Sequence, residues 1–280
     1  MQVIQTIAQL KEVLQAERAK GKVIGLVPTM GALHDGHASL VKRSVAENDI
    51  TVVSIFLNPT QFNDPKDLER YPRTFESDCN ILQECGAQIV FAPSVSEVYP
   101  EPDTRHFSYS PTDSVMEGAK RPGHFNGVCQ IVSKLFEMTD PDYAYFGEKD
   151  YQQIAVIRRM VDDLGFRVNI VPCPVIREED GLAMSSRNTL LAEDEKAIAP
   201  NIYRILCESK KLSLGIAETE QWVIDQINNI PGLEVEYYSI VDGDTLASIN
   251  DWSDANSVVG CITVYCGKTP IRLIDHIRYK

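Results

Sequence analysis

The sequence predicts an α/β protein, in which a doubly wound parallel sheet domain is followed by a smaller α+β domain. Three observations predict it. Residues 1–176 alternate short apolar, β-branched runs with segments of helical periodicity, which is typical of a parallel sheet with helices on both faces. Residues 177–280 instead have two helical segments followed by three β-rich runs. The length of 280 residues corresponds to about two domains at ~150 residues each.

The expected elements of the first domain follow one another in a regular order. The expected strands are short runs rich in apolar and β-branched residues, and the first two suit burial inside a sheet, at residues 22–27, 50–56, 88–91, 143–146 and 168–171. The expected helices have apolar residues at three- and four-residue spacing, at residues 4–20, 36–47, 74–85, 124–138 and 152–164. Gly86 and Gly165 directly follow two of these helices, as is typical of helix ends. We therefore expect a Rossmann-like sheet, which binds ligands at the carboxyl ends of its strands near a switch in strand order.

The second domain is expected to contain helices at residues 193–211 and 219–229, then strands at residues 235–241, 258–265 and 271–274. The boundary falls near residues 176–180, which gives domains of 1–176 and 177–280. The acidic turn at residues 178–181 is either a hinge or the tip of a hairpin. Two long loops, 56–75 and 93–123, are rich in turn-forming residues. Loops of that length are often functional, although surface decoration is the simpler alternative.

Composition excludes several classes of protein. The chain has 27 Lys and Arg against 40 Asp and Glu, a net charge of −13, which argues against nucleic acid as a partner. No apolar stretch approaches the ~18 residues of a membrane span, and we expect neither membrane binding nor a secretory peptide. The seven cysteines show neither a Cys-x-x-Cys pair nor zinc-finger spacing. We expect them to be reduced thiols in a cytoplasmic protein.

The segment at residues 27–37 carries the sharpest chemical signal, because it follows an expected strand and opens an expected helix. Gly31 and Gly36 remove side chains where a phosphate could approach closely. His37 lies at the helix start, where unpaired N–H groups and the helix dipole favour phosphate. His34 and His37 can both donate hydrogen bonds to phosphate oxygens. A metal site is the alternative, but no third ligand has matching spacing.

Three further segments place polar and charged residues in turns. Residues 145–150 again connect a strand to a helix, and Lys149 supplies a cation there; an ordinary glycine turn capped by Asp150 is the alternative. Residues 182–188 place two serines beside Arg187, which suits a polyphosphate but also suits a helix cap. Residues 117–125 gather two cations and a histidine, for which a solvated basic turn is an equal alternative. Arg70 and Arg73 either add to this charge or pair with Asp67 and Glu69.

Taken together, these segments resemble the pantoate–β-alanine ligase family of the HxGH nucleotidyltransferase superfamily. The matching segments stand in that family's order at residues 28–37, 56–62, 71–74, 121–125, 146–150 and 184–188. The resemblance covers nearly the whole chain. It implies two steps: the carboxylate of pantoate attacks the α-phosphorus of ATP, giving pantoyl adenylate and pyrophosphate, and the amine of β-alanine then displaces AMP to give pantothenate. Magnesium is expected with the ATP phosphates, and a homodimer through the first domain.

The resemblance also assigns residues. His34, His37, Lys149 and Arg187 are expected to be catalytic, with His37 the proton donor. Gln61 and Gln153 are expected to hydrogen-bond pantoate, and Gln61 also to place β-alanine. The residues expected to bind ATP are Met30, Gly31, Ala32, Leu33, His34, Asp35, Gly36, His37, Gly147, Glu148, Lys149, Asp150, Ile176, Met184, Ser185, Ser186 and Arg187.

Three other functions have the same early histidine motif or the same fold. A transferase that moves AMP to a phosphorylated cofactor precursor would lack the segments around Gln61 and Gln153. A non-catalytic ATP sensor would be expected to have lost a histidine or Arg187, yet all are present. A tRNA ligase would need an anticodon domain, for which the chain has no room, and the charge of −13 opposes polyanion binding.

Overall fold

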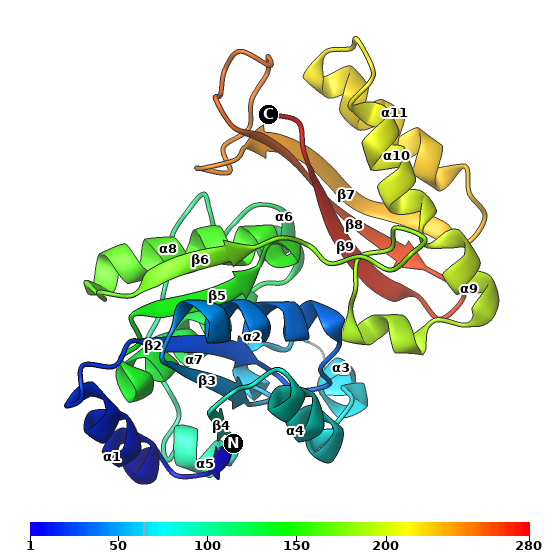
Figure 1. Cartoon of the computed structure of the whole chain (residues 1–280). Coiled ribbons are helices and arrows are strands. Elements are labelled where there is room, and N and C mark those ends of the chain that lie inside the picture. Colours follow the sequence, from blue (N-terminus) through cyan, green and yellow to red (C-terminus); the bar gives the residue numbers. More distant parts are fainter. Residues whose placement is uncertain (64) are drawn as a thin grey trace.

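A six-stranded parallel sheet forms the first part of the chain in the computed structural model, which describes residues 1–63 and 65–280 (Figure 1). Its strands lie in the order β1–β4–β3–β2–β5–β6. Their bounds are Gln2–Ile4 (β1), Ile24–Thr29 (β2), Ile50–Ile55 (β3), Ile89–Phe91 (β4), Tyr143–Gly147 (β5) and Asn169–Cys173 (β6). The chain moves outward from β2 to β4 and then returns to place β5 beside β2. A topological switch point therefore lies between the carboxyl ends of β2 and β5.

Helices cover both faces of this sheet, so the doubly wound arrangement is confirmed. The longer helices are α1 (Ile7–Arg18), α2 (Asp35–Glu47), α4 (Phe75–Glu84), α7 (His124–Thr139) and α8 (Tyr151–Leu164). Neighbouring strand residues point to opposite sides: Val52 packs in one core with residues of α1, α7 and α8, and Val53 in another with residues of α2 and α4. The central strands β2 and β3 are buried on both faces, so their sequences are largely apolar rather than alternating, whereas the edge strands β1 and β6 are partly exposed.

The loops 56–75 and 93–123 contain short helical segments that the sequence did not predict. These are the 3₁₀ turn η1 (Pro59–Gln61) and the helices α3 (Pro65–Arg70), α5 (Val95–Val98) and α6 (Met116–Lys120). Residue 64 of the first loop lies outside the described residues. Segments this short lack the repeated apolar spacing that predicts a helix.

The rest of the chain forms an antiparallel sheet, called here the C-terminal sheet, with the order β7–β8–β9 (Figure 1). Its strands are β7 (Leu233–Asp242), β8 (Val258–Cys266) and β9 (Ile271–Arg278), and its helices are α9 (Glu193–Ile198), α10 (Asn201–Ser209) and α11 (Ile216–Asn228). Residues of α10 and α11 pack on one face of the sheet. The other face packs on the first part of the chain, where Val259 and Cys261 meet Met116 and Tyr151. The predicted α+β arrangement is thus confirmed.

Several expected elements have different bounds in the structure: the helix expected at residues 219–229 begins at Ile216, and the strand expected at residues 271–274 extends to Arg278. The helix expected at residues 4–20 begins at Ile7, because the Thr6 hydroxyl caps it and residues 2–4 pair with β4 as an edge strand. The helix expected at residues 193–211 is two helices separated around Pro200, which has no N–H to donate. The acidic turn at residues 178–181 is a hairpin tip, since Arg177 and Ala183 form an antiparallel bridge. Among the described residues, no helix is long and apolar enough to cross a membrane.

Candidate active site

The segment after β2 is held in a tight turn by a buried carboxylate from α4. Gly31 and Ala32 both have positive φ, at 83° and 52°. The Asp78 carboxylate accepts hydrogen bonds from the N–H groups of Ala32 (3.1 Å) and Leu33 (2.8 Å). The turn then delivers the chain into α2 at the switch point. Sequence reasoning missed Asp78, because an acid in the first turn of a helix is a common capping feature.

The two histidines of this segment form the start of α2. The Nδ1 atom of His34 accepts a hydrogen bond from the N–H of Gly36 (3.1 Å), and the Nδ1 atom of His37 accepts one from the N–H of His34 (3.4 Å). The ring centroids are 4.1 Å apart. Because each Nδ1 is an acceptor, each neutral ring carries its proton on Nε2. The backbone of the helix start thus fixes both tautomers as hydrogen-bond donors.

Burial keeps both imidazoles uncharged. Burial, together with the charge of Lys149, lowers the pKa of His34 to about 4. Burial, with His34 and Lys149 close by, lowers the pKa of His37 to about 3. At neutral pH both rings are therefore neutral N–H donors.

The structure brings most of the residues expected to bind ATP to one cavity, here called the nucleotide cavity. It encloses about 850 Å³ between the switch point and the segment 174–187. The expected residues that line it are Met30, His34, Gly36, His37, Gly147, Lys149, Asp150, Ile176, Met184, Ser185, Ser186 and Arg187. The first and third motifs, far apart in the sequence, thus face each other across one space.

Five residues expected at the nucleotide are not among the described residues that line this cavity. The N–H groups of Ala32 and Leu33 are bonded to Asp78, and Gly31 lies in the same turn. Asp35 lines an outer groove beside His34. Glu148 lies 3.5 Å from Arg278 of β9, with which it forms an ion pair. Ala32 and Leu33 are thus held in the turn, and Glu148 meets the C-terminal sheet; their expected contact with the nucleotide stays a prediction.

A second cavity, here called the amide cavity, opens from the first. It encloses about 930 Å³ and contains both glutamines expected to bind pantoate, Gln61 and Gln153. The two cavities share lining residues, among them Met30, His37 and Gln153. The far wall of the amide cavity is apolar and is made by Phe56, Phe62, Val128, Ile131, Val132 and Leu135. The arrangement suits a small ligand with both polar and methyl groups.

Neighbouring residues hold Gln61 in place while Gln153 faces the cavity. The amide of Asn58 donates to the Gln61 side-chain oxygen (3.2 Å), and the Gln61 amide lies 3.2 Å from the Met30 sulfur. Gln152, next to Gln153, is buried and donates to the carbonyls of Thr112 and Val115, both at 2.8 Å. Gln152 is therefore a structural residue, whereas the side chain of Gln153 faces the amide cavity.

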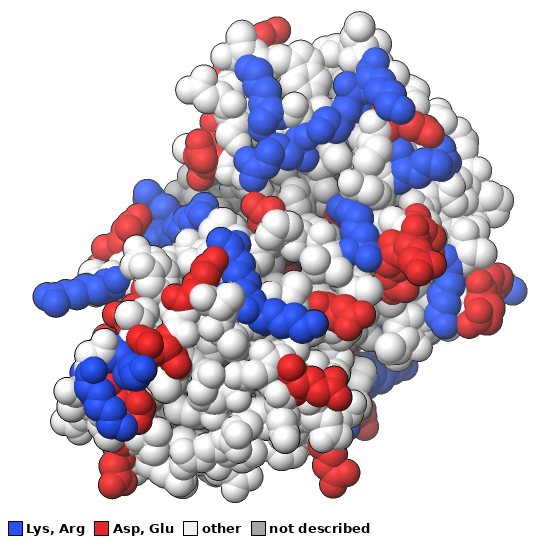
Figure 2. Space-filling model, viewed as in Figure 1, with Lys and Arg blue, Asp and Glu red and all other residues white. Residues whose placement is uncertain are grey.

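Cations reach the site from three segments. Lys149 lines both the nucleotide cavity and the groove toward the C-terminal sheet. Arg187 lies 2.8 Å from the Asp67 carboxylate of α3, so Asp67 pairs with Arg187 instead of the Arg70 or Arg73 pairing left open above. Arg121 lines the amide cavity. On the face in Figure 2, acidic and basic side chains are interspersed over the lower part of the molecule, whereas basic side chains gather in a band over the upper part.

Comparison with known proteins gives one consistent result. The family described as pantoate-beta-alanine ligase matches residues 2–278. The chain is 59% identical to a pantothenate synthetase of Bacteroides thetaiotaomicron and 60% identical to one of Phocaeicola vulgatus, over the whole of this chain and at least 99% of each relative.

Solved structures agree with these relatives. Pantothenate synthetase from Thermus thermophilus has a TM-score of 0.92 at 42% identity, covering 100% of this chain and 99% of that one. The pantoate-beta-alanine ligase from Francisella tularensis, complexed with beta-gamma ATP and beta-alanine, has a TM-score of 0.85 at 35% identity, covering 100% and 98%. The chain therefore belongs to the pantoate–β-alanine ligase family.

Proposed function

We propose that this chain condenses pantoate with β-alanine, using ATP and forming pantothenate, AMP and pyrophosphate through a pantoyl adenylate. One observation carries the proposal: a cavity with two histidine N–H donors and two cations opens directly into a cavity with two glutamines and an apolar wall. The first suits a triphosphate, and the second suits a small hydroxy acid with methyl groups. Membership of the family makes the enzyme a ligase.

In the first step an oxygen of the pantoate carboxylate attacks the α-phosphorus of ATP. The bond from that phosphorus to the β-phosphate bridging oxygen breaks, and pyrophosphate leaves. Negative charge develops on the phosphate oxygens, where His34 and His37 offer fixed N–H donors and Lys149 and Arg187 offer positive charge. A neutral imidazole needs no reorganisation to donate this hydrogen bond. We propose that His37 acts in this step as a hydrogen-bond donor; the proton-donor role expected from the resemblance stays a prediction.

In the second step the amine of β-alanine attacks the acyl carbon of the adenylate. The C–N bond forms, the bond from the acyl carbon to the AMP oxygen breaks, and the amine releases a proton to solvent. Gln61 lines the amide cavity beside Asn58 and beside Met30, which lines both cavities, and there it would orient both the acyl group and the amine. The β-alanine in the Francisella tularensis complex supports this substrate.

A magnesium ion bound together with ATP would not need a separate cluster of protein ligands. The described residues hold no group of three or more His, Cys, Asp or Glu side chains suited to a metal. Magnesium bound with nucleotides needs only one or two carboxylates, because the phosphates supply other ligands. Asp150 lines both the nucleotide cavity and the amide cavity and would be the protein ligand. The ion would neutralise phosphate charge.

Three further features belong to the proposal. The chain divides into a nucleotide- and pantoate-binding domain, residues 1–176, and a C-terminal lid domain, residues 177–280; residues 174–176, which line the nucleotide cavity, support this division. A cytoplasmic location is supported by seven free cysteines, typical of a reducing compartment. A homodimer is proposed from the family resemblance.

Product analysis tests the proposal. Purified protein with pantoate, β-alanine, ATP and magnesium is expected to form pantothenate, AMP and pyrophosphate in equal amounts. Release of ADP and phosphate would contradict an adenylate mechanism. A stable dinucleotide product would instead assign the chain to the transferases that move AMP to a cofactor precursor.

A further inference from the structure

The Glu117 carboxylate lies between the two parts of the molecule. Glu117 belongs to α6, at the end of the loop 93–123, and is buried, with 8% of its surface exposed. Its oxygens accept hydrogen bonds from Tyr237 of β7 (2.9 Å), Thr263 of β8 (2.8 Å) and Arg272 of β9 (2.5 and 2.6 Å). One side chain of the first part of the chain thus contacts every strand of the C-terminal sheet.

The charge of Glu117 is stabilised by these partners. Burial alone would raise its pKa, but the hydrogen bonds and charge of Arg272 lower the pKa of Glu117 to about 2. Arg272 also pairs with Glu236, at 2.5 Å, so it remains bound to the C-terminal sheet. Taking both charges out of water offsets most of their attraction, so the pair adds little net stability, although removal of one partner would leave a buried charge without its counterion.

The same carboxylate leads toward the amide cavity. Arg121, one helical turn after Glu117, lies 3.6 Å from its Oε2. Arg121 donates to Nε2 of His124 at 3.1 Å, and Nδ1 of His124 donates to the carbonyl oxygen of Gln61 at 2.8 Å. A continuous polar chain therefore runs from the C-terminal sheet to the backbone of a proposed substrate residue.

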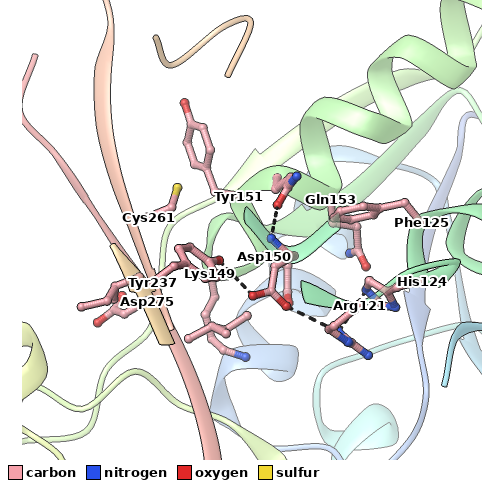
Figure 3. A pocket seen from close by; sticks show the side chains of 14 residues that line it. Arg121, His124, Phe125, Lys149, Asp150, Tyr151, Gln153, Tyr237, Cys261 and Asp275 are labelled. Carbon is pink, nitrogen blue, oxygen red and sulfur yellow. Dashed lines mark hydrogen bonds and ion pairs between the residues drawn. The ribbon is translucent and has the colours of Figure 1, made fainter. Parts of the chain in front are cut away.

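Side chains of this polar chain also line two of the cavities. Figure 3 shows Arg121 and His124 side by side on one wall of a smaller cavity, with Tyr237 on the wall formed by the C-terminal sheet. Arg121 and His124 also line the amide cavity, whereas neither is among the described residues that line the nucleotide cavity. A shift of this segment would therefore alter the amide cavity first.

We infer that Glu117 is a positioning residue, which ties the segment carrying Arg121 and His124 to the C-terminal sheet and thereby fixes the wall of the amide cavity. The inference rests on the proposed function, since it takes the amide cavity to bind pantoate. It adds a role for the contact between the two parts of the molecule: their relative position determines the affinity for pantoate.

The test replaces Glu117 with glutamine, which keeps its shape but removes the charge that Arg121 and Arg272 face. We measure pyrophosphate exchange into ATP as a function of pantoate and of ATP concentration. In Glu117→Gln the KM for pantoate is expected to rise about tenfold, the loss typical of one charge-assisted hydrogen bond. The KM for ATP should change less than about twofold, because Arg121 and His124 do not line its cavity.

Asp103→Asn is the matched control. The Asp103 carboxylate is also buried and holds Arg105 (2.7 Å) and Lys134 (3.7 Å), but all three lie in the first part of the chain and outside the cavities. This variant is expected to lose thermal stability and keep both KM values. Gln153→Ala is the positive control for a lost pantoate contact.

A double variant separates positioning from stability. If Glu117 acts through its ion pair, Glu117→Gln combined with Arg272→Gln should raise the pantoate KM no more than the worse single variant. Should Glu117→Gln fail to fold, Arg272→Lys is measured in its place, since it keeps the charge but loses the two parallel hydrogen bonds, and a rise in pantoate KM is expected again.

Two results would overturn the inference. A Glu117→Gln protein that resembles Asp103→Asn, less stable but with an unchanged pantoate KM, would make the carboxylate purely structural. Effects that multiply in the double variant would show that the pair does not act as a unit. A wild-type protein without any pantoate-dependent exchange would instead refute the proposed function itself, so the two failures are distinguishable.

Discussion

At the scale of single residues, the site depends on two histidines that the backbone of α2 orients. The N–H of Gly36 fixes the tautomer of His34, and the N–H of His34 fixes that of His37. Glycine at position 36 is required by this closeness, because a Cβ there would lie 2.8 Å from the His34 ring. The His-x-Gly-His spacing is thus explained by the geometry of a helix start.

Replacing His37 with alanine removes one fixed donor to the phosphates. We expect the adenylation rate to fall by about 10²–10³-fold, or ~2.7–4 kcal/mol, the scale of one preorganised donor to a developing oxyanion. Single-turnover formation of pantoyl adenylate measures it. His106→Ala is the control, because His106 is exposed and outside the cavities. A His37→Ala rate near that of wild type would remove His37 from the mechanism.

Buried His124 is expected to make stability depend on pH. Burial and the nearby Arg121 lower the pKa of His124 to about 4, whereas the unfolded side chain titrates near 6.5. Between pH 6.5 and 4 the unfolded state binds a proton that the folded state does not, so the free energy of unfolding falls as the pH falls. Above pH 6.5 this contribution vanishes.

The measurement is urea unfolding of wild type and His124→Asn across that pH range. The free energy of unfolding of wild type should fall more steeply than that of the variant, by up to about 3 kcal/mol at pH 4. Carboxylates titrate in both proteins and cancel in the difference. Parallel curves would mean that His124 binds a proton in the folded protein as readily as in the unfolded chain, so that its pKa is not lowered.

At the scale of elements, the turn η1 and the helix α7 meet without an intervening side chain. A Cβ at Gly127 of α7 would lie 2.7 Å from the Cα of Gln61. The Gly127 carbonyl also accepts a hydrogen bond from Asn58 at 3.1 Å. Gln61 is therefore placed by backbone packing as well as by its own hydrogen bonds.

Gly127→Ala is expected to displace Gln61, because backbone atoms cannot yield as a flexible side chain does. Stability should fall by about 1–3 kcal/mol, as for other overpacked sites, and the pantoate KM should rise more than the ATP KM. Thermal unfolding and steady-state kinetics check both. Gly215→Ala is the control, since its Cβ would have room, with the nearest atom 3.6 Å away. Equal changes in the two KM values would contradict the placement.

The elements were predicted well where their signal is periodic or continuous. The strands at residues 50–55 and 143–147 were predicted from short runs rich in β-branched, apolar or aromatic residues, whose central positions are buried. The three-residue strand β1 was not predicted, because its pairing with β4 is a tertiary contact. One continuous helix was predicted across Pro200, although the structure has two helices, one on each side of it. Gln61 lies in the turn η1, which packs on α7. A contact between such distant segments could not be predicted from the sequence.

At the scale of the whole molecule, two contacts cross the groove between the loop 56–75 and the segment 184–188. Arg187 pairs with Asp67 at 2.8 Å, and the Tyr71 hydroxyl lies 3.5 Å from that of Ser186. Both cavities lie behind these contacts. An acyl adenylate would hydrolyse in open water, so closure of this groove over bound substrates is expected to protect it.

Limited trypsin digestion tests this closure. Cleavage after Arg70 or Arg73 is expected to slow when ATP, magnesium and pantoate are present together. Cleavage after Lys210 or Lys211, which lie outside the cavities, should not change and serves as the internal control. Equal rates at Arg70 with and without substrates would show that the loop does not close.

The site as a whole was only partly visible in the sequence. The motifs at residues 34–37, 147–150 and 184–187 could be recognised locally, and the switch point explains why the first two meet. Asp78 and Tyr71 could not be assigned, because each acts through a contact with a distant segment. For the segment that contains Arg121, the sequence favoured a functional loop and a solvated basic turn equally. The contacts of Arg121 with Glu117 and His124 show that its side chain faces inward.

The most direct test of the central claim is exchange of labelled pyrophosphate into ATP, with magnesium and without β-alanine. Our account predicts exchange that requires pantoate, because the adenylate forms reversibly before the amine is needed. Exchange that is absent in a folded, ATP-binding protein, or that proceeds without pantoate, would contradict it.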